Sequence, residues 1–344
     1  MGRPAQWIVN PVADVAVALS WVPFAVLAHV VDGRPQPLRI LFAAVMFVSF
    51  AHQPLTFPLV YASPWRLATH RRTFIWFPVA ALLAVLLATH LSMTLVAVVG
   101  GLWNLEHILM QRYGMGRMYG RKAGEGQAGV ERALLVAWFL VPLLWVAVSG
   151  RLGRVLDRLA SQSVDAQAAR MLTRMVPEAR VALLLAAGAA VWLTSTWLRR
   201  QRHLGDRANP AKSLYLASTG ALFALAFVDP VAAVVGFVAS HSIEYFVIVG
   251  RSVGSERVHA GLLGRLVRRP HGRLVFFGSY TAVVGAMFGV LYWVVAPAVL
   301  TVAVLTIGAI HFFFDAFIWK LRRPLVAASL VVPAGDVPSA VTAG

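Results

Sequence analysis

The most constraining feature of this chain is a series of apolar runs, each as long as a membrane-crossing helix. A span needs about 20 mostly apolar residues, because the hydrocarbon core is about 30 Å thick and a helix rises 1.5 Å per residue. The sequence predicts ten spans, at 11–31, 38–60, 73–89, 91–110, 132–150, 181–198, 213–228, 231–249, 274–295 and 298–319. We therefore expect an all-α transmembrane bundle of about ten spans, with eight as the lower bound.

Composition supports this class of protein. Of the 344 residues, 59% are hydrophobic and only 13% are charged, and the mean hydropathy is +0.72. A soluble domain usually has about 25% charged residues. These values exclude a soluble enzyme, a disordered chain and a secreted disulfide scaffold. The chain has no cysteine, which also excludes iron–sulfur clusters, thiolate metal sites and cysteine nucleophiles.

The distribution of basic residues predicts the orientation. The formal net charge is +17. If the N-terminus lies in the cytoplasm, 23 of the 31 lysines and arginines fall in inner segments, and the outer turns other than 151–180 are nearly uncharged. Because these charges punctuate apolar runs and form no continuous stripe, they predict membrane topology and not nucleic-acid binding. We expect a multi-pass protein of the bacterial inner membrane with both termini cytoplasmic.

The predicted domain organisation is simple. Residues 1–323 are expected to form a single transmembrane domain, and residues 324–344 a disordered tail. The outer loop 151–180 mixes apolar residues with arginines, which predicts a helix on the membrane surface or, alternatively, a partner-binding face.

Polar side chains inside the spans carry the strongest functional signal, because such groups are costly in lipid and usually serve a purpose. The eight residues that follow all lie on even-numbered spans, which run from outside to inside. Counting 1.5 Å per residue from the inner span ends places one layer roughly 13 Å deep and a second layer one turn closer to the cytoplasm. The deeper layer holds His52, Asn104, His241 and His311, and the second holds Thr56, His107, Glu244 and Asp315.

The spacing within each span places these residues in pairs on one helix face. Each pair is separated by three or four residues, as in His241 with Glu244 and His311 with Asp315. Glu106 differs, because it is adjacent to His107 and points about 100° away around the helix.

Imidazole and carboxylate are the ligand set of iron, zinc and manganese sites. We predict His52, His107, His241 and His311 as metal ligands. Glu244 and Asp315 are predicted as catalytic carboxylates, acting as ligands or as acceptors behind the histidines, with Thr56 and Asn104 orienting them.

Other roles for the same residues remain open. A buried histidine in a membrane helix often only bonds a neighbouring carbonyl or hydroxyl. A proton path uses the same residue types, and two of the histidines could hold a haem.

Two short segments resemble a known family. Ile310–Asp315 (IHFFFD) and Phe237–Ser242 (FVASHS) resemble elements of the membrane β-carotene-cleaving dioxygenases of the bacteriorhodopsin-related-protein (Brp/Blh-like) type. The resemblance implies a polytopic fold with essential intramembrane histidines that bind iron. The sequence departs from the family in its first spans, which lack a Pro-His-Gly element, and near His241, where Glu244 or Tyr245 replaces a second histidine.

The combined prediction is an integral-membrane, histidine-ligated non-haem iron enzyme that oxidises a lipophilic substrate such as a carotenoid, isoprenoid or acyl chain. The protein would bind one or two iron ions. Its partners would be the lipid bilayer and the substrate, and the sequence does not indicate an electron donor. The alternatives are a proton-coupled transporter or channel, and a scaffold in which the histidines bridge helices.

Overall fold

The computed structural model describes residues 7–125, 129–159, 176–205, 208–256, 259, 261–294 and 297–332. It is all-helical, with 87% helix and no strand among these residues. The chain forms two compact units, each made of two chain segments. The first unit comprises Met1–Met46 and Ala97–Ile243, and the second comprises Phe47–Val96 and Glu244–Gly344. The sequence predicts one domain and shows no boundary, because three helices run through both units.

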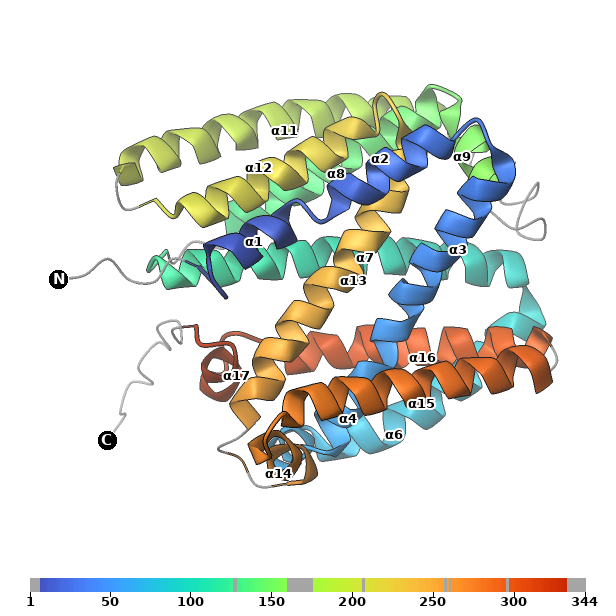
Figure 1. Cartoon of the computed structure of the whole chain (residues 1–344). Helices are drawn as coiled ribbons and strands as arrows, with labels where there is room; N and C mark the ends of the chain where they lie inside the picture. The colour runs from blue at the N-terminus through green and yellow to red at the C-terminus, as the bar shows by residue number, and fades with distance from the viewer. Residues whose placement is uncertain are drawn as a thin grey trace, which may run out of the picture. The chain divides into compact units, whose positions relative to one another are not determined.

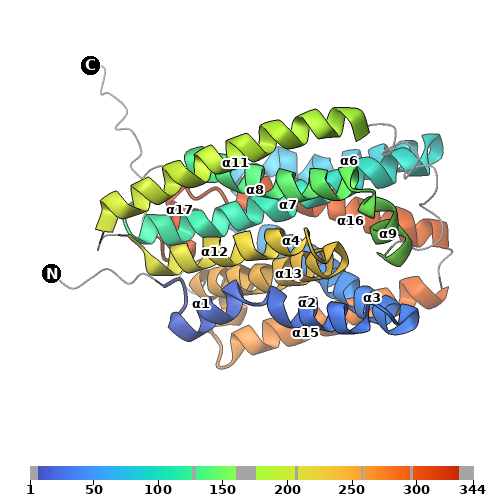
Figure 2. The same cartoon turned by 90° about the horizontal axis from the view of Figure 1, so that it is seen from above.

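The first unit has its own core. Its helices are α1 (Pro11–Ala18), α2 (Trp21–Val31), most of α3 (Pro35–His52) and of α7 (Met93–Lys122), α8 (Gly129–Val148), α9 (Arg151–Leu159), α11 (Val176–Leu204), α12 (Pro210–Leu225) and the first half of α13 (Pro230–Ser255). Helix α8 packs against α11 and α12, and α1 packs against α12 (Figure 2). Ile108, Leu134 and Val235 are fully buried in this core.

The second unit contains the end of α3, η1 (Gln53–Leu55), α4 (Thr56–Tyr61), α5 (Pro64–Thr69), α6 (Arg71–Leu91), the second half of α13, α14 (Leu262–Arg268), α15 (Gly272–Val294), α16 (Pro297–Ile318) and α17 (Pro324–Ser329). Helix α16 packs against α6, α4 and α15 (Figure 1). Aromatic packing is prominent in its core, where the ring of Phe314 lies edge-on to that of Phe74 at 4.7 Å.

Among the described residues, eight helical stretches are long and apolar enough to cross a bilayer: 11–31, 35–61, 71–91, 129–148, 177–204, 230–255, 272–290 and 298–318. Large apolar side chains on them are exposed, including Leu184 and Trp192 on α11 and Leu83 on α6. Such faces suit lipid, since water would disfavour so much contiguous apolar surface. These features indicate a membrane protein, as the sequence predicts.

The eight stretches leave out two predicted spans. The predicted span 213–228 corresponds to α12, whose 16 residues extend about 24 Å and fall short of the hydrocarbon thickness. The predicted span 91–110 forms the first part of α7, a continuous helix of 30 residues. A count between eight and ten therefore stays a prediction.

Two predicted spans are not single regular helices. The first is divided between α1 and α2, with Leu19 and Ser20 at the junction. The second passes into a 3₁₀ turn at Gln53–Leu55, directly after His52. Pro54 lies in this turn, and because proline has no N–H and its ring clashes with the preceding helical turn, it interrupts the regular α-helix.

The segments at 151–180 and after residue 323 were both predicted to lie outside the bundle. Helix α9 at Arg151–Leu159 agrees with a helix in the outer loop, and residues 160–175 lie outside the described residues. The prediction of a disordered tail from Pro324 differs from the structure, where α17 buries Val326, Ala327 and Ser329. These residues are small or apolar, and they bury one face of the helix. The low complexity of the segment led to the prediction of disorder. Residues 333–344 are not described.

Candidate functional site

Two of the predicted ligands meet inside the second unit. His52 ends α3 and His311 lies on α16, and each side chain is about 1% exposed. Their Nε2 atoms are 3.2 Å apart, and the two rings stand nearly perpendicular. Because α3 ends at His52, its ring lies at the end of a regular helix. The contact between His52 and His311 therefore depends on the 3₁₀ turn at Pro54, which the sequence did not predict.

A chain of polar contacts continues from His311. Its Nδ1 atom lies 2.8 Å from the Thr56 hydroxyl at the start of α4, and that hydroxyl lies 3.2 Å from the Tyr245 hydroxyl of α13. Tyr245 in turn donates a hydrogen bond to Oδ1 of Asp315 at 3.0 Å. The second carboxylate oxygen of Asp315 is 3.7 Å from Nε2 of His311.

If Thr56 donates to Tyr245, the contacts select one tautomer of His311. Because Tyr245 donates to Asp315, its oxygen is free to accept the Thr56 proton, and the Thr56 oxygen can then accept from Nδ1 of His311. In this arrangement Nδ1 of His311 carries the proton and Nε2 presents a lone pair toward His52. A carboxylate that orients a histidine through its other nitrogen is typical of metal-binding imidazoles.

The donor distances fit a transition metal. With metal–nitrogen bonds of about 2.1 Å, two adjacent ligand atoms lie roughly 3.0–3.4 Å apart in octahedral or tetrahedral geometry. The two Nε2 atoms, 3.2 Å apart, satisfy this condition. The Asp315 oxygen, 3.7 Å from His311, can reach the same ion at a wider angle. Two histidines and one carboxylate are the ligand set of many non-haem iron sites.

The other two predicted ligands meet inside the first unit. His107 on α7 and His241 on α13 have ring centroids 5.2 Å apart and perpendicular planes. One nitrogen of each ring lies within 4.8 Å of a nitrogen of the other. Gln111, one turn after His107, donates from Nε2 to the carbonyl oxygen of His241 at 2.9 Å, which fixes α7 against α13.

The remaining predicted residues vary in exposure. Glu244 lies on α13, three residues after His241, and is fully buried. Asn104 is half-buried on α7, one turn before His107, and no contact described here joins it to that ring. Glu106 is exposed, in agreement with the predicted direction away from His107.

Sequence reasoning missed the role of Tyr245. Its ring is 4.8 Å from that of His52 and 5.0 Å from that of His311, and its hydroxyl joins Thr56 to Asp315. The available signal was its position four residues after His241, which places both on one face of a helix. The family resemblance involves Tyr245 only as a replacement for a histidine.

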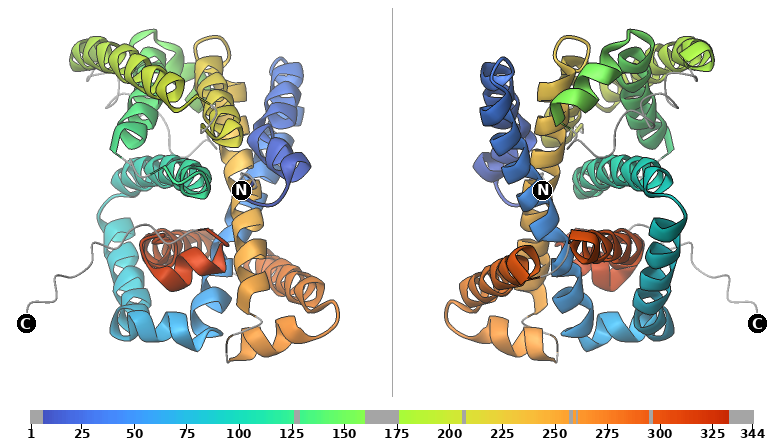
Figure 3. Two further views of the ribbon diagram at one scale, coloured as in Figure 1. Left: turned by 90° about the vertical axis from the view of Figure 1, so that its left-hand side faces the viewer. Right: turned by 90° about the vertical axis from the view of Figure 1, so that its right-hand side faces the viewer.

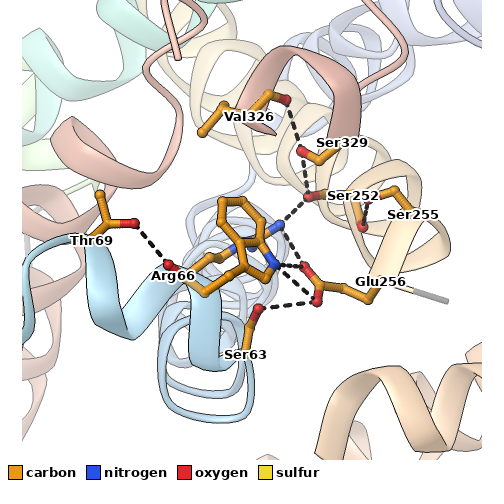
Figure 4. Close-up of polar contacts among 9 residues, drawn as sticks. Ser63, Arg66, Thr69, Ser252, Ser255, Glu256, Val326 and Ser329 are labelled. Atoms are coloured by element: carbon orange, nitrogen blue, oxygen red, sulfur yellow. Dashed lines mark hydrogen bonds and ion pairs between the residues drawn. The ribbon is translucent and has the colours of Figure 1, made fainter. Parts of the chain in front are cut away.

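Buried ion pairs were also missed, because arginines and lysines near span ends were interpreted as topology signals. In the second unit, the Arg66 Nη2 atom lies 3.2 Å from the Glu256 carboxylate, which also accepts from Ser63 and Trp65 (Figure 4). In the first unit, the ammonium of fully buried Lys212 contacts the carboxylates of Glu125 and Glu131. Both clusters lie outside the histidine pairs and stabilise helix ends.

Comparisons with protein-family profiles, curated proteins and solved structures find no match to this chain in any of the three. The site must therefore be interpreted from its own chemistry.

Proposed function

We propose that this chain is an integral-membrane enzyme in which His52, His107, His241 and His311 bind non-haem iron, and that it oxidises a lipophilic substrate. The observation that supports this most directly is the Nε2–Nε2 distance of 3.2 Å between two buried histidines, one of which is oriented by a carboxylate through two hydroxyls.

Helix α13 carries both His241 of the first pair and Tyr245, which contacts the second pair. Helix α13 is uninterrupted from Pro230 to Ser255, as Figure 3 also shows in yellow to orange. His241 is therefore one turn from Tyr245 on the same face, at a rise of about 6 Å. Tyr245 contacts the rings of both His52 and His311. We propose that His107 and His241, whose rings are 5.2 Å apart, bind iron as well.

The protein residues have separable tasks in this proposal. Bound iron would supply the redox chemistry needed to activate dioxygen. His52 and His311 hold the ion, and Asp315 accepts the hydrogen bond that orients His311 through Tyr245 and Thr56. The full burial of Glu244, one turn from His241, suits a carboxylate that accepts or donates a proton away from water.

The substrate class follows from the surroundings. The second-unit site is enclosed by aromatic rings, among them Phe312 beside His311 and Trp319 beside Tyr245. Its helices expose apolar faces suited to lipid, so an apolar molecule could approach sideways from the bilayer without crossing water. We propose a carotenoid, isoprenoid or acyl chain as the substrate class.

Metal content tests the proposal. Purified wild-type protein should hold iron, and both His311→Ala and His241→Ala should lose most of it, as measured by elemental mass spectrometry per chain. His203→Ala, which changes an exposed histidine near the end of α11, is the matched control and should retain wild-type iron. Equal iron in the wild type and both site variants would contradict the proposal.

A second function is favoured by one observation. The contacts from His311 through Thr56 and Tyr245 to Asp315 form a chain of exchangeable protons, as a proton-coupled transporter would require. If this function holds, proteoliposomes should show a pH-driven flux that His52→Ala abolishes, with no iron in the purified protein. Iron binding without flux would favour the enzyme.

A further inference from the structure

A pocket of about 150 Å³ lies in the second unit, away from the histidines. It is bordered by α5, the first turn of α6, the end of α16 and the beginning of α17. Its walls include the apolar side chains of Phe74, Phe317 and Leu325, and its polar groups include Arg66 and Arg323. The eight candidate spans place Arg71 at the start of one and Ile318 at the end of another, so the pocket lies where two spans end.

One basic residue of the pocket has unused hydrogen-bond donors. Arg66 is 3% exposed, and its Nη2 atom bonds Ser252 and pairs with Glu256 (Figure 4). Its Nε and Nη1 atoms are enclosed and have no hydrogen-bond partner among the described residues. A buried N–H without an acceptor is unfavourable, so an acceptor from outside the protein is expected there.

The second basic residue has no counter-charge in the described part of the chain. Arg323 is half-buried, and its guanidinium contacts Nε2 of His70, a neutral acceptor. Burial, followed by the charges of Arg323 and Lys320, lowers the pKa of His70, so the ring stays neutral at pH 7. No ion pair joins Arg323 to a carboxylate among the described residues. The pocket therefore carries a net positive charge beside apolar walls.

We propose that this pocket binds the phosphate of an anionic phospholipid, with the start of an acyl chain against Phe74, Phe317 and Leu325. Three observations favour a lipid over other anions. The pocket lies at the ends of two membrane-spanning helices, where lipid phosphates are found. Its walls are largely apolar, and the nearby basic residues Arg71, Arg72 and Lys320 add attraction for an anionic surface.

Native mass spectrometry of the purified full-length protein tests this proposal, with phosphatidylglycerol as the probe and phosphatidylcholine as the neutral control. We expect wild-type protein to retain phosphatidylglycerol at concentrations at which phosphatidylcholine dissociates. Arg323→Gln should reduce the affinity at least tenfold. Arg322→Gln, an adjacent exposed arginine that does not border the pocket, should leave it unchanged.

A second variant separates binding from folding. Thr69 borders the pocket and is exposed, so Thr69→Trp should fill the pocket without changing the charge and should also weaken phosphatidylglycerol binding. Unchanged binding in both Arg323→Gln and Thr69→Trp would overturn the proposal. If millimolar inorganic phosphate displaces the lipid completely, the pocket is a site for free phosphate, and the lipid assignment is wrong.

Discussion

At the residue scale, Thr56 is the side chain on which the proposed geometry depends most. Its hydroxyl is fully buried and joins Nδ1 of His311 to the hydroxyl of Tyr245. A hydroxyl that accepts one hydrogen bond and donates another fixes both the orientation and the tautomer of the His311 ring. The role of Thr56 is to connect these side chains, because its hydroxyl does not ionise at neutral pH.

Replacement of Thr56 should therefore weaken iron binding without unfolding the protein. Thr56→Val keeps the shape and removes the hydroxyl, and we expect a loss of about 10–100-fold in iron affinity, the usual effect of removing such a partner. Titration of the purified protein against a competing chelator measures it. Thr56→Ser should restore most of the affinity, and identical affinities in wild type and Thr56→Val would show that the hydroxyl does not orient His311.

At the element scale, the residue just before α14 has a backbone conformation that only glycine adopts easily. Gly261 precedes α14 with φ +127°, and the backbone N–H of Leu263 donates to the carbonyl oxygen of Ala62 in the loop before α5. A Cβ at this position would lie 2.4 Å from Cδ of Pro64 and 3.1 Å from the carbonyl oxygen of Ala62. Both the dihedral angle and the close approach therefore require glycine.

Gly261→Ala should destabilise the second unit by roughly 1–3 kcal/mol, since a side chain at this φ is strained and Pro64 must move. The apparent melting temperature in detergent measures the effect. Gly278→Ala is the matched control on α15, where no atom lies within 4 Å of the added Cβ, and it should melt at or above the wild-type temperature. Equal melting temperatures for the two variants would show that the backbone at position 261 does not require glycine.

The elements also explain which parts of the site could be predicted. Spacings of three and four residues correctly predicted that His311 and Asp315 share a face, because helical periodicity is local. The depth estimate predicts His52 and His311 at one level of the membrane, and in the structure their Nε2 atoms lie 3.2 Å apart. Tyr245 was missed because its importance comes from contacts to α4 and α16, which no local pattern encodes.

At the scale of the whole molecule, orientation in the membrane remains a prediction from charge. The basic residues cluster in alternate connections, which predicts both termini in the cytoplasm. The chain offers a clean test because it contains no cysteine, so any introduced thiol is the only one present. Two exposed positions on opposite predicted sides are Ser149, after α8, and Thr69, at the end of α5.

A membrane-impermeant maleimide should label Ser149→Cys in intact spheroplasts, because the connection after α8 is predicted to lie outside. Thr69→Cys should react only after permeabilisation, because the connection before α6 is predicted to lie inside. Retained iron content in both variants would serve as the folding control. The reverse labelling pattern would show the opposite orientation, and labelling of both in intact cells would exclude the predicted span count between these two positions.

The sequence by itself determined that the chain is a helical membrane protein, because twenty-residue apolar runs have few other stable arrangements. It also predicted that His52, His241 and His311 would be buried, and hence where function was to be sought. Only the tertiary structure decided which of them touch: that His52 faces His311, that Tyr245 joins Thr56 to Asp315, and that Arg66 is an ion-pair partner of Glu256 and not a topology signal. The physical reason is that periodicity and hydropathy act within one helix, whereas a metal-binding geometry depends on the packing of several helices.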